Sequence, residues 1–208
     1  KKSKAMIKLA PIQNTLEQAA KDHLASLKNG KNGFISPITI LQDWVIHLVG
    51  SQRILIQSVI DDFDNIIKGD AKKLRAKIGD LGEVRDEDFS NAIVEKMRYE
   101  NFRTSSRARD FIRALNIKSC PYCNAQFVVA LGSSGKLLCH FDHIYPKSKY
   151  PYLCISFFNL VPCCSYCNLL KSDKDPFGRE DFHHPFEKSL TEHFKFQATA
   201  LAIKNFAI

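Results

Sequence analysis

Two short cysteine pairs, CPYC at residues 120–123 and CSYC at residues 164–167, decide the fold that we predict for this chain. A C-x-x-C turn holds two thiolates on one side of a knuckle, and two such knuckles complete a tetrahedral site for Zn²⁺. Cys163 adjoins the second pair and allows another register, but the two-residue gap favours Cys164. We therefore predict a structural zinc site that contributes folding energy, formed by Cys120, Cys123, Cys164 and Cys167. That these cysteines are only buried thiols stays open at this point.

All seven cysteines lie between residues 120 and 167. The odd number and the paired spacing fit metal binding in a reducing cytosol better than a secreted disulfide framework, so we expect a cytoplasmic protein. The three cysteines outside the pairs are interpreted as small apolar residues, Cys139, Cys154 and Cys163. The first residues, KKSKAMIKLA, are basic and are not followed by the apolar stretch of a signal peptide. No apolar run approaches the roughly 18 residues that span a bilayer, so no membrane partner is expected.

Before the first knuckle, apolar residues recur at a spacing of three to four up to about residue 118, which predicts helices. Thr15 is expected to cap the first helix and Gly69 to end the third. The expected helices cover about residues 15–30, 37–50, 51–67, 71–78, 87–99 and 105–116. After residue 118, strand-like alternation, glycine-serine turns and the cysteines appear together. The predicted fold class is therefore α+β, with an all-helical domain at residues 1–118 and a second domain with a C-terminal extension at residues 119–208.

The net charge of +8 is concentrated in the first half of the chain. A basic surface attracts phosphate backbones without reading sequence, although a solvated helix face has the same composition. The densest group lies within residues 98–118, where Glu100 and Asp110 oppose six basic residues, Arg98, Arg103, Arg107, Arg109, Arg113 and Lys118.

Between the two cysteine pairs the stretch FDHIYPKSKYP, residues 141–151, places an aspartate and a histidine side by side. A regular strand points neighbouring side chains to opposite faces, and Pro146 ends such a strand. The run therefore indicates a functional site at a strand end followed by a basic turn. The residues of the turn and of the following helix that could contact phosphates are Lys147, Ser148, Lys149 and Lys171.

Over about residues 119–176, the motifs CPYC, DHIYPKS and NLVPCCSYCNLLK occur in an order that resembles the HNH endonuclease family, specifically its zinc-framed branch. The resemblance implies a ββα-metal fold in which two strands and a helix hold one divalent ion. It also implies that His143 is the general base and that the side chain of Asn159 holds the loop and orients His143. Asp142 matches the first metal ligand, and Asn168 stands where most members have the last histidine. An Asp/Asn ligand set suits Mg²⁺ or Mn²⁺ better than Zn²⁺.

Hydrolysis of a phosphodiester needs a group that deprotonates water and a cation that stabilises the pentacovalent dianion and the leaving oxygen. One histidine and one divalent ion meet these needs if both face the same phosphate. Because Asp142 and His143 are neighbours, we expect the strand to twist or bulge at this point. The sequence thus predicts a metal-dependent HNH endonuclease with DNA as its substrate, leaving a 5′-phosphate and a 3′-hydroxyl as in the family.

The order of a helical region followed by an HNH segment resembles the nuclease subunits of bacterial anti-phage systems, including the Septu type, in which a partner ATPase holds the nuclease. This resemblance implies a regulated defence effector whose helical domain docks on a partner protein. Two alternatives stay open. One is a zinc-ribbon nucleic-acid-binding module without catalysis, and the other is a toxin that cleaves RNA.

Overall fold

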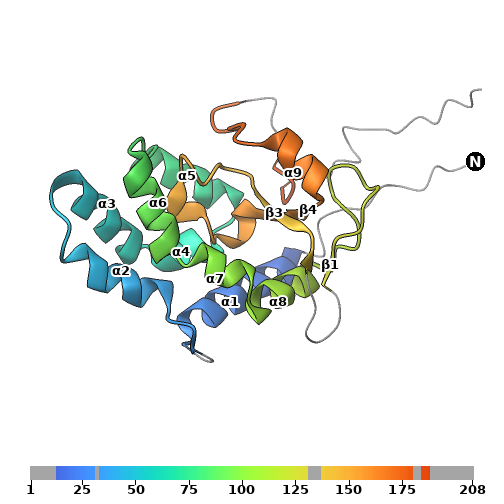
Figure 1. Cartoon of the computed structure of the whole chain (residues 1–208), viewed down its shortest axis with the longest axis horizontal. Coiled ribbons are helices and arrows are strands. Elements are labelled where there is room, and N and C mark those ends of the chain that lie inside the picture. The colour runs from blue at the N-terminus through green and yellow to red at the C-terminus, as the bar shows by residue number, and fades with distance from the viewer. Residues whose placement is uncertain (1–12, 31–32, 131–136, 180–183, 188–208) are drawn as a thin grey trace, which may run out of the picture.

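Figure 1 shows a computed structural model of the chain, which describes residues 13–30, 33–130, 137–179 and 184–187. Between residues 13 and 115 the described segments contain helices and no strand. In chain order these helices are α1 (Gln13–Lys28), α2 (Pro37–Val45), α3 (Gly50–Asp61), α4 (Phe63–Lys68), α5 (Ala71–Leu81), α6 (Glu87–Lys96), α7 (Tyr99–Arg103) and α8 (Ser106–Leu115).

The helices follow the predicted ones, with two breaks that periodicity did not indicate. The helix expected over residues 51–67 is divided at Asp62 into α3 and α4. The helix expected over residues 87–99 ends at Lys96, because Arg98 adopts a left-handed conformation with φ 62° and turns the chain into α7. α1 begins at Gln13, so Thr15 lies inside the helix and is not its cap.

Gly69 follows α4, as predicted, and its backbone amide donates to the carbonyl of Asn65 at 2.8 Å. A Cβ at this position would collide with that same carbonyl oxygen. The turn from α4 to α5 therefore requires a residue without a side chain.

Two small antiparallel sheets follow the helices, so the chain is helix-rich with a minor β component, in agreement with the predicted α+β class. β1 (Val129–Ala130) pairs with β2 (Leu137–Leu138), and β3 (His140–His143) pairs with β4 (Leu160–Cys163). Two short 3₁₀ helices, Pro151–Leu153 and Phe157–Asn159, lie between β3 and β4. The last described helix, α9 (Ser165–Lys171), begins directly after β4.

The bulge expected between Asp142 and His143 is absent from β3. Each residue of β3 faces one residue of β4, with Asp142 opposite Val161 and His143 opposite Leu160. The side chains therefore alternate normally between the two faces of the sheet.

The strand β3 is anchored to the helices through its aromatic residue. The ring of Phe141 packs against Phe102 of α7 and Phe111 of α8, with centroids 5.7 and 5.5 Å apart. Buried side chains from both sides of residue 118 belong to one contiguous core, so the domain boundary at that position stays a prediction. The predicted C-terminal extension beyond Glu187 lies outside the described residues. Within the described chain no helix combines the length and the apolar character needed to cross a bilayer.

His23 joins α1 to the segment that precedes β4. Its Nε2 lies 2.9 Å from the carbonyl oxygen of Ile155, and its ring meets Phe102 and Phe111 edge-on. Burial lowers the pKa of His23 to about 4, although the hydrogen bond to Ile155 acts in the opposite direction. The folded protein thus holds this imidazole neutral, with Nε2–H as the donor.

We predict that the buried imidazole of His23 makes folding stability fall in acid. The unfolded chain binds this proton near pH 6.5 and the folded chain only near pH 4, so stability is present above pH 6.5 and is lost as the pH falls towards 4. The loss from this residue is about 3 kcal/mol over that window. Urea unfolding from pH 4 to 7 should show a flatter profile for His23→Gln than for the wild type. His47→Gln, at an exposed position, is the control, and equal profiles for all three proteins would contradict the prediction.

Candidate active site and metal centre

The four cysteines predicted to bind zinc converge in the structure. The Sγ atoms of Cys120, Cys123, Cys164 and Cys167 all lie within 4.8 Å of one another. Four thiolates around one ion, with Zn–S bonds of about 2.3 Å, have sulfur atoms roughly 3.8 Å apart. The separation of 3.9 Å between the Sγ atoms of Cys123 and Cys164 is close to that value. The cluster therefore indicates zinc binding.

Local backbone geometry forms each half of this cluster. In the first knuckle the amide of Asn124 donates to the carbonyl of Cys120 at 2.7 Å, and Asn124 itself is left-handed with φ 53°. In the second, Cys164 caps α9 and its Sγ accepts from the amide of Cys167 at 3.4 Å. A hydrogen bond from the backbone of Ala125 lowers the pKa of the Cys123 thiol to about 7, which favours the thiolate that a metal requires.

A cleft of about 370 Å³ lies beside the zinc cluster, between α7, β3, the turn after β3 and α9. All four residues of β3 line it, including Asp142 and His143, together with Asn168 of α9. Alternation alone would present only every second residue to a cavity on one face of a sheet. Since α7 packs on the Phe141 face of β3 and Asn168 of α9 also lines the cleft, the cleft borders β3 between these two helices.

His143 is held from two sides. Its Nε2 lies 3.0 Å from the carbonyl oxygen of Cys154, and its ring packs against the ring of Tyr99 at 4.8 Å between centroids. Because the carbonyl only accepts, Nε2 carries the proton and the lone pair of Nδ1 remains for another partner. Burial lowers the pKa of His143 to about 3, with the charges of Lys147 and Lys171 adding to the effect and the Cys154 carbonyl opposing it. The imidazole is neutral at neutral pH.

Asn159 holds the loop that carries Cys154, whose carbonyl oxygen is the hydrogen-bond partner of His143. Its amide nitrogen donates to the carbonyls of Tyr145 and Leu153 at 3.1 and 3.0 Å, and its Oδ1 accepts from the amide of Tyr145 at 2.8 Å. The side chain is fully buried. These three bonds fix both ends of the loop next to Cys154, whose carbonyl oxygen lies 3.0 Å from His143 Nε2.

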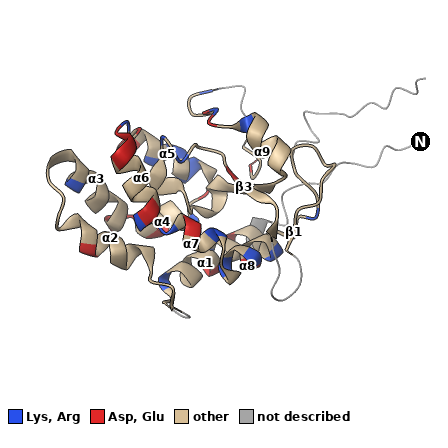
Figure 2. Ribbon diagram, viewed as in Figure 1, with Lys and Arg blue, Asp and Glu red and all other residues tan. Residues whose placement is uncertain are grey.

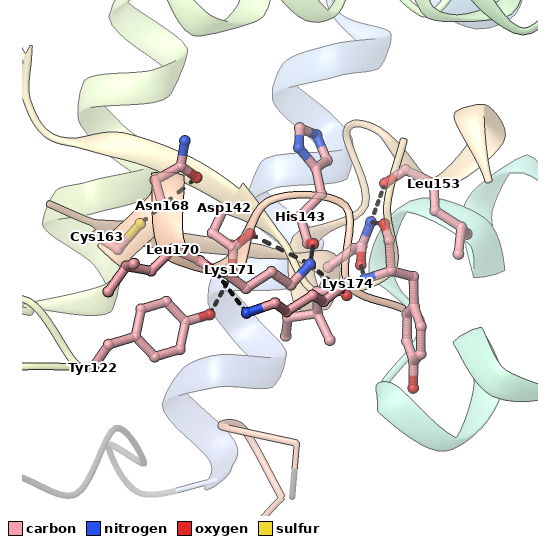
Figure 3. Close-up of polar contacts among 12 residues, drawn as sticks. Tyr122, Asp142, His143, Leu153, Cys163, Asn168, Leu170, Lys171 and Lys174 are labelled. Atoms are coloured by element: carbon pink, nitrogen blue, oxygen red, sulfur yellow. Dashed lines mark hydrogen bonds and ion pairs between the residues drawn. The ribbon is translucent and has the colours of Figure 1, made fainter. Parts of the chain in front are cut away.

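Asp142 lies in a network on the α9 side of the sheet. Its carboxylate accepts from the hydroxyl of Tyr122 at 2.5 Å and lies 3.5 Å from the ammonium of Lys171. Figure 3 shows this carboxylate pointing towards Lys171 and the imidazole of His143 pointing away from it. Burial raises the pKa of the Asp142 carboxyl, although Lys171 and Tyr122 act in the opposite direction.

The donors around the cleft fit a hard divalent ion. Asp142 offers a carboxylate oxygen and Asn168 an amide oxygen, whose present neighbour is the weakly donating thiol of Cys163 at 3.9 Å. Oxygen ligands with space for water and phosphate are typical of Mg²⁺ and Mn²⁺ sites. The four clustered cysteines, in contrast, offer sulfur ligands and form a separate and softer site.

The residues predicted to contact phosphates fall into two pairs. Lys147 and Ser148 line the cleft, whereas Lys149 and Lys171 do not. The ammonium of Lys149 lies 3.4 Å from Asp175. The ammonium of Lys171 donates to the carbonyls of His143 and Ile144, as the dashed lines in Figure 3 show, so it holds the end of β3.

One member of the predicted basic group within residues 98–118, whose basic residues are blue in Figure 2, is engaged in structural contacts, and only one lines the cleft. Arg107 stacks 4.1 Å above the ring of Phe34 and donates to the carbonyls of Ser26 and Asn29, so it is a structural residue. Arg103 alone among the six lines the cleft.

Sequence reasoning missed one wall of the cleft, which α7 supplies through Tyr99, Glu100 and Arg103. These residues precede the first cysteine pair by about twenty positions, and no motif connects them to it. The available signals were the basic composition near Arg103 and the aromatic residues of the same stretch. Neither indicates which residue of a helix faces a site.

Comparison with known proteins supports the assignment of the second part of the chain. The family model described as HNH endonuclease matches residues 120–174. This segment contains the four clustered cysteines, β3, β4 and α9, and it includes Asp142, His143, Asn159 and Asn168. Neither the curated proteins nor the solved structures yield a match to the chain. The match supports a nuclease of the HNH type.

We predict that the purified protein contains about one zinc ion per chain and that chelation destabilises it. Cys123→Ser should lose this zinc and several kcal/mol of unfolding free energy, because a structural zinc contributes directly to folding. Metal analysis and urea unfolding measure both. Cys139→Ser is the control, since Cys139 lies outside the cluster, and it should keep the zinc. Equal zinc content in wild type and Cys123→Ser would contradict the prediction.

A second prediction separates the two roles considered for Lys171. If its ammonium holds backbone carbonyls and Asp142, Lys171→Met should lower the unfolding free energy by roughly 1–3 kcal/mol. The salt dependence of DNA binding should then stay unchanged. The matched control is Lys174→Met, because Lys174 also donates to a carbonyl, that of Leu170 at 3.0 Å, but is exposed. Unchanged stability with a salt slope reduced by about one would instead identify Lys171 as a phosphate contact.

Proposed function

We propose that this protein is a metal-dependent HNH endonuclease that hydrolyses phosphodiester bonds in DNA. The observation that carries the proposal is that Asp142, His143 and Asn168, all within the segment that matches the family, line one cleft. A base, two oxygen donors and a cation next to them are the groups that phosphodiester hydrolysis requires.

In this proposal His143 is the general base. Its Nε2–H donates to the Cys154 carbonyl, so Nδ1 accepts the proton of the attacking water. Burial keeps the imidazole neutral and ready to accept, but it also makes the free site a weak base. The negative charge of a phosphate that enters the cleft offsets this weak basicity of His143, because a nearby anion raises the proton affinity of an imidazole. Asn159 acts by holding the loop on which this hydrogen bond depends.

Asp142 and Asn168 are the proposed ligands of the catalytic Mg²⁺ or Mn²⁺. When bound, such an ion stabilises charge on the phosphoryl and leaving oxygens. The ammonium of Lys171 lies 3.5 Å from the buried Asp142 carboxylate and balances its charge. The four cysteines bind structural Zn²⁺ and fix the start of α9, from which Asn168 projects.

A regulated role in bacterial defence, with a partner protein such as an ATPase holding the nuclease as in the Septu type, is part of the proposal. An exposed apolar group at the α2–α3 corner supports a docking surface on the helical region, since Ile46, Val49 and Ile54 are 64, 79 and 69% exposed. Figure 1 places α2 and α3 at the opposite end of the molecule from α9. A partner bound there would leave the cleft open to DNA.

The proposal predicts that wild type cuts plasmid DNA in Mg²⁺ or Mn²⁺ but not in EDTA. His143→Ala should reduce the rate by about 10²–10⁴-fold, the usual contribution of a general base, while it retains zinc and binds DNA. The assay is a plasmid digest, repeated with the predicted partner if the isolated protein is inert.

The same assay with single-stranded DNA and RNA separates the alternatives. Preferential cleavage of RNA would favour the toxin. Binding of DNA without cleavage, identical for wild type and His143→Ala in the presence of the partner, would favour a non-catalytic zinc module and contradict the proposal.

A further inference from the structure

The cleft has a wall that lies outside the segment matching the HNH family. α7 precedes that segment by sixteen residues, counted from Arg103 to Cys120, yet Tyr99, Glu100 and Arg103 line the cleft together with His143. The packing of Phe102 on Phe141 fixes α7 against β3, so this wall has a defined position. Its charged groups therefore face whatever enters the cleft.

Arg103 is held by a contact that a ligand can replace. Its Nε lies 3.2 Å from Glu100 Oε2, one turn earlier on the same helix, and the two side chains are 47 and 66% exposed. Exposed ion pairs of this kind contribute between roughly 0 and 1 kcal/mol. A phosphate offers the planar guanidinium two parallel hydrogen bonds and can compete with Glu100.

Lys147 provides a second cation, presented by the turn after β3. Its ammonium lies 6.0 Å from the centroid of the Tyr99 ring, the same ring that packs on His143. The turn is fixed from α6, because the hydroxyl of Ser90 donates to the carbonyl of Ser148 at 3.0 Å. Among the ion pairs between described residues none involves Lys147, so its charge remains available to a phosphate.

We propose that Arg103 and Lys147 form a binding subsite for the backbone phosphates that flank the scissile bond, and that Glu100 competes with these phosphates for Arg103. The subsite rests on the proposed function, since it takes nucleic acid as the ligand of the cleft. It assigns α7 a direct part in substrate binding.

The test uses a matched pair on the next helix. Arg113 and Asp110 form an i,i+3 ion pair at 3.0 Å with exposures of 53 and 69%, nearly equal to the Arg103–Glu100 pair, but neither residue lines the cleft. Arg113→Gln and Asp110→Asn therefore change the net charge as Arg103→Gln and Glu100→Gln do, without touching the subsite. Differences between the two sets report the local contact.

The measurement is the affinity of full-length, zinc-loaded protein for a fluorescent DNA duplex without added Mg²⁺ or Mn²⁺, by anisotropy over a range of salt concentrations. All variants carry His143→Ala as well, so that cleavage does not interfere. Arg103→Gln and Lys147→Gln should each weaken binding by about 3- to 10-fold and reduce the salt slope by about 0.9. Glu100→Gln should tighten binding by about 2- to 3-fold, since it removes both a competitor and a negative charge.

Arg103→Lys keeps the charge and should retain the salt slope. This control shows that the weaker DNA binding of Arg103→Gln does not come from a folding defect. Affinities of Arg103→Gln and Glu100→Gln that equal those of Arg113→Gln and Asp110→Asn would overturn the subsite. That result leaves the endonuclease proposal intact if wild type still cuts DNA through His143. Absence of any nucleic-acid binding by the wild type would overturn both.

Discussion

The packing of Phe141 between Phe102 and Phe111 is the contact on which the position of the cleft depends. It joins β3 to both α7 and α8. A two-stranded sheet is only marginally stable alone, so β3 and β4 need this apolar partner. Because Asp142 and His143 directly follow Phe141 in the same strand, the burial that stabilises the sheet also sets the direction of these two candidate site residues.

The helices and the cysteine cluster could be predicted from the sequence, because both depend on the spacing of residues along the chain. The 3–4 pattern located the helices, and the two C-x-x-C pairs located the cluster, because each depends on residues close in the chain or on a fixed ligand geometry. The break at Arg98 was missed because it depends on one left-handed backbone conformation that periodicity does not record. Of the twist or bulge expected in β3, the one-to-one pairing with β4 excludes the bulge, because the argument for it assumed that both side chains must leave the same face of the sheet. The α7 wall depends on long-range packing, which no local pattern carries.

Burial has opposite effects on the two titratable neighbours of β3. It lowers the pKa of His143 and raises that of Asp142, so both side chains are driven towards their neutral forms. For a general base the neutral form is the useful one. For a metal ligand it is not, and the ammonium of Lys171 together with the hydroxyl of Tyr122 counters the effect at Asp142. The position of Lys171 is consistent with its contacts to the Asp142 carboxylate and to two backbone carbonyls.

One contiguous core gives the helical region two connections to the site. The helical region covers β3 with apolar side chains, and its residue Tyr99 contacts the imidazole of His143 directly. A hydrogen bond from the amide of Val84 to the carbonyl of Lys149 and another from Ser90 to Ser148 tie the turn after β3 to the α5–α6 region. Any displacement of the helices by a bound partner would therefore shift Tyr99 and Lys147 relative to His143. Since general-base catalysis depends on hydrogen-bond geometry, a small shift of this kind would change the proposed activity, and this is how a partner on the proposed docking surface would act on the cleft.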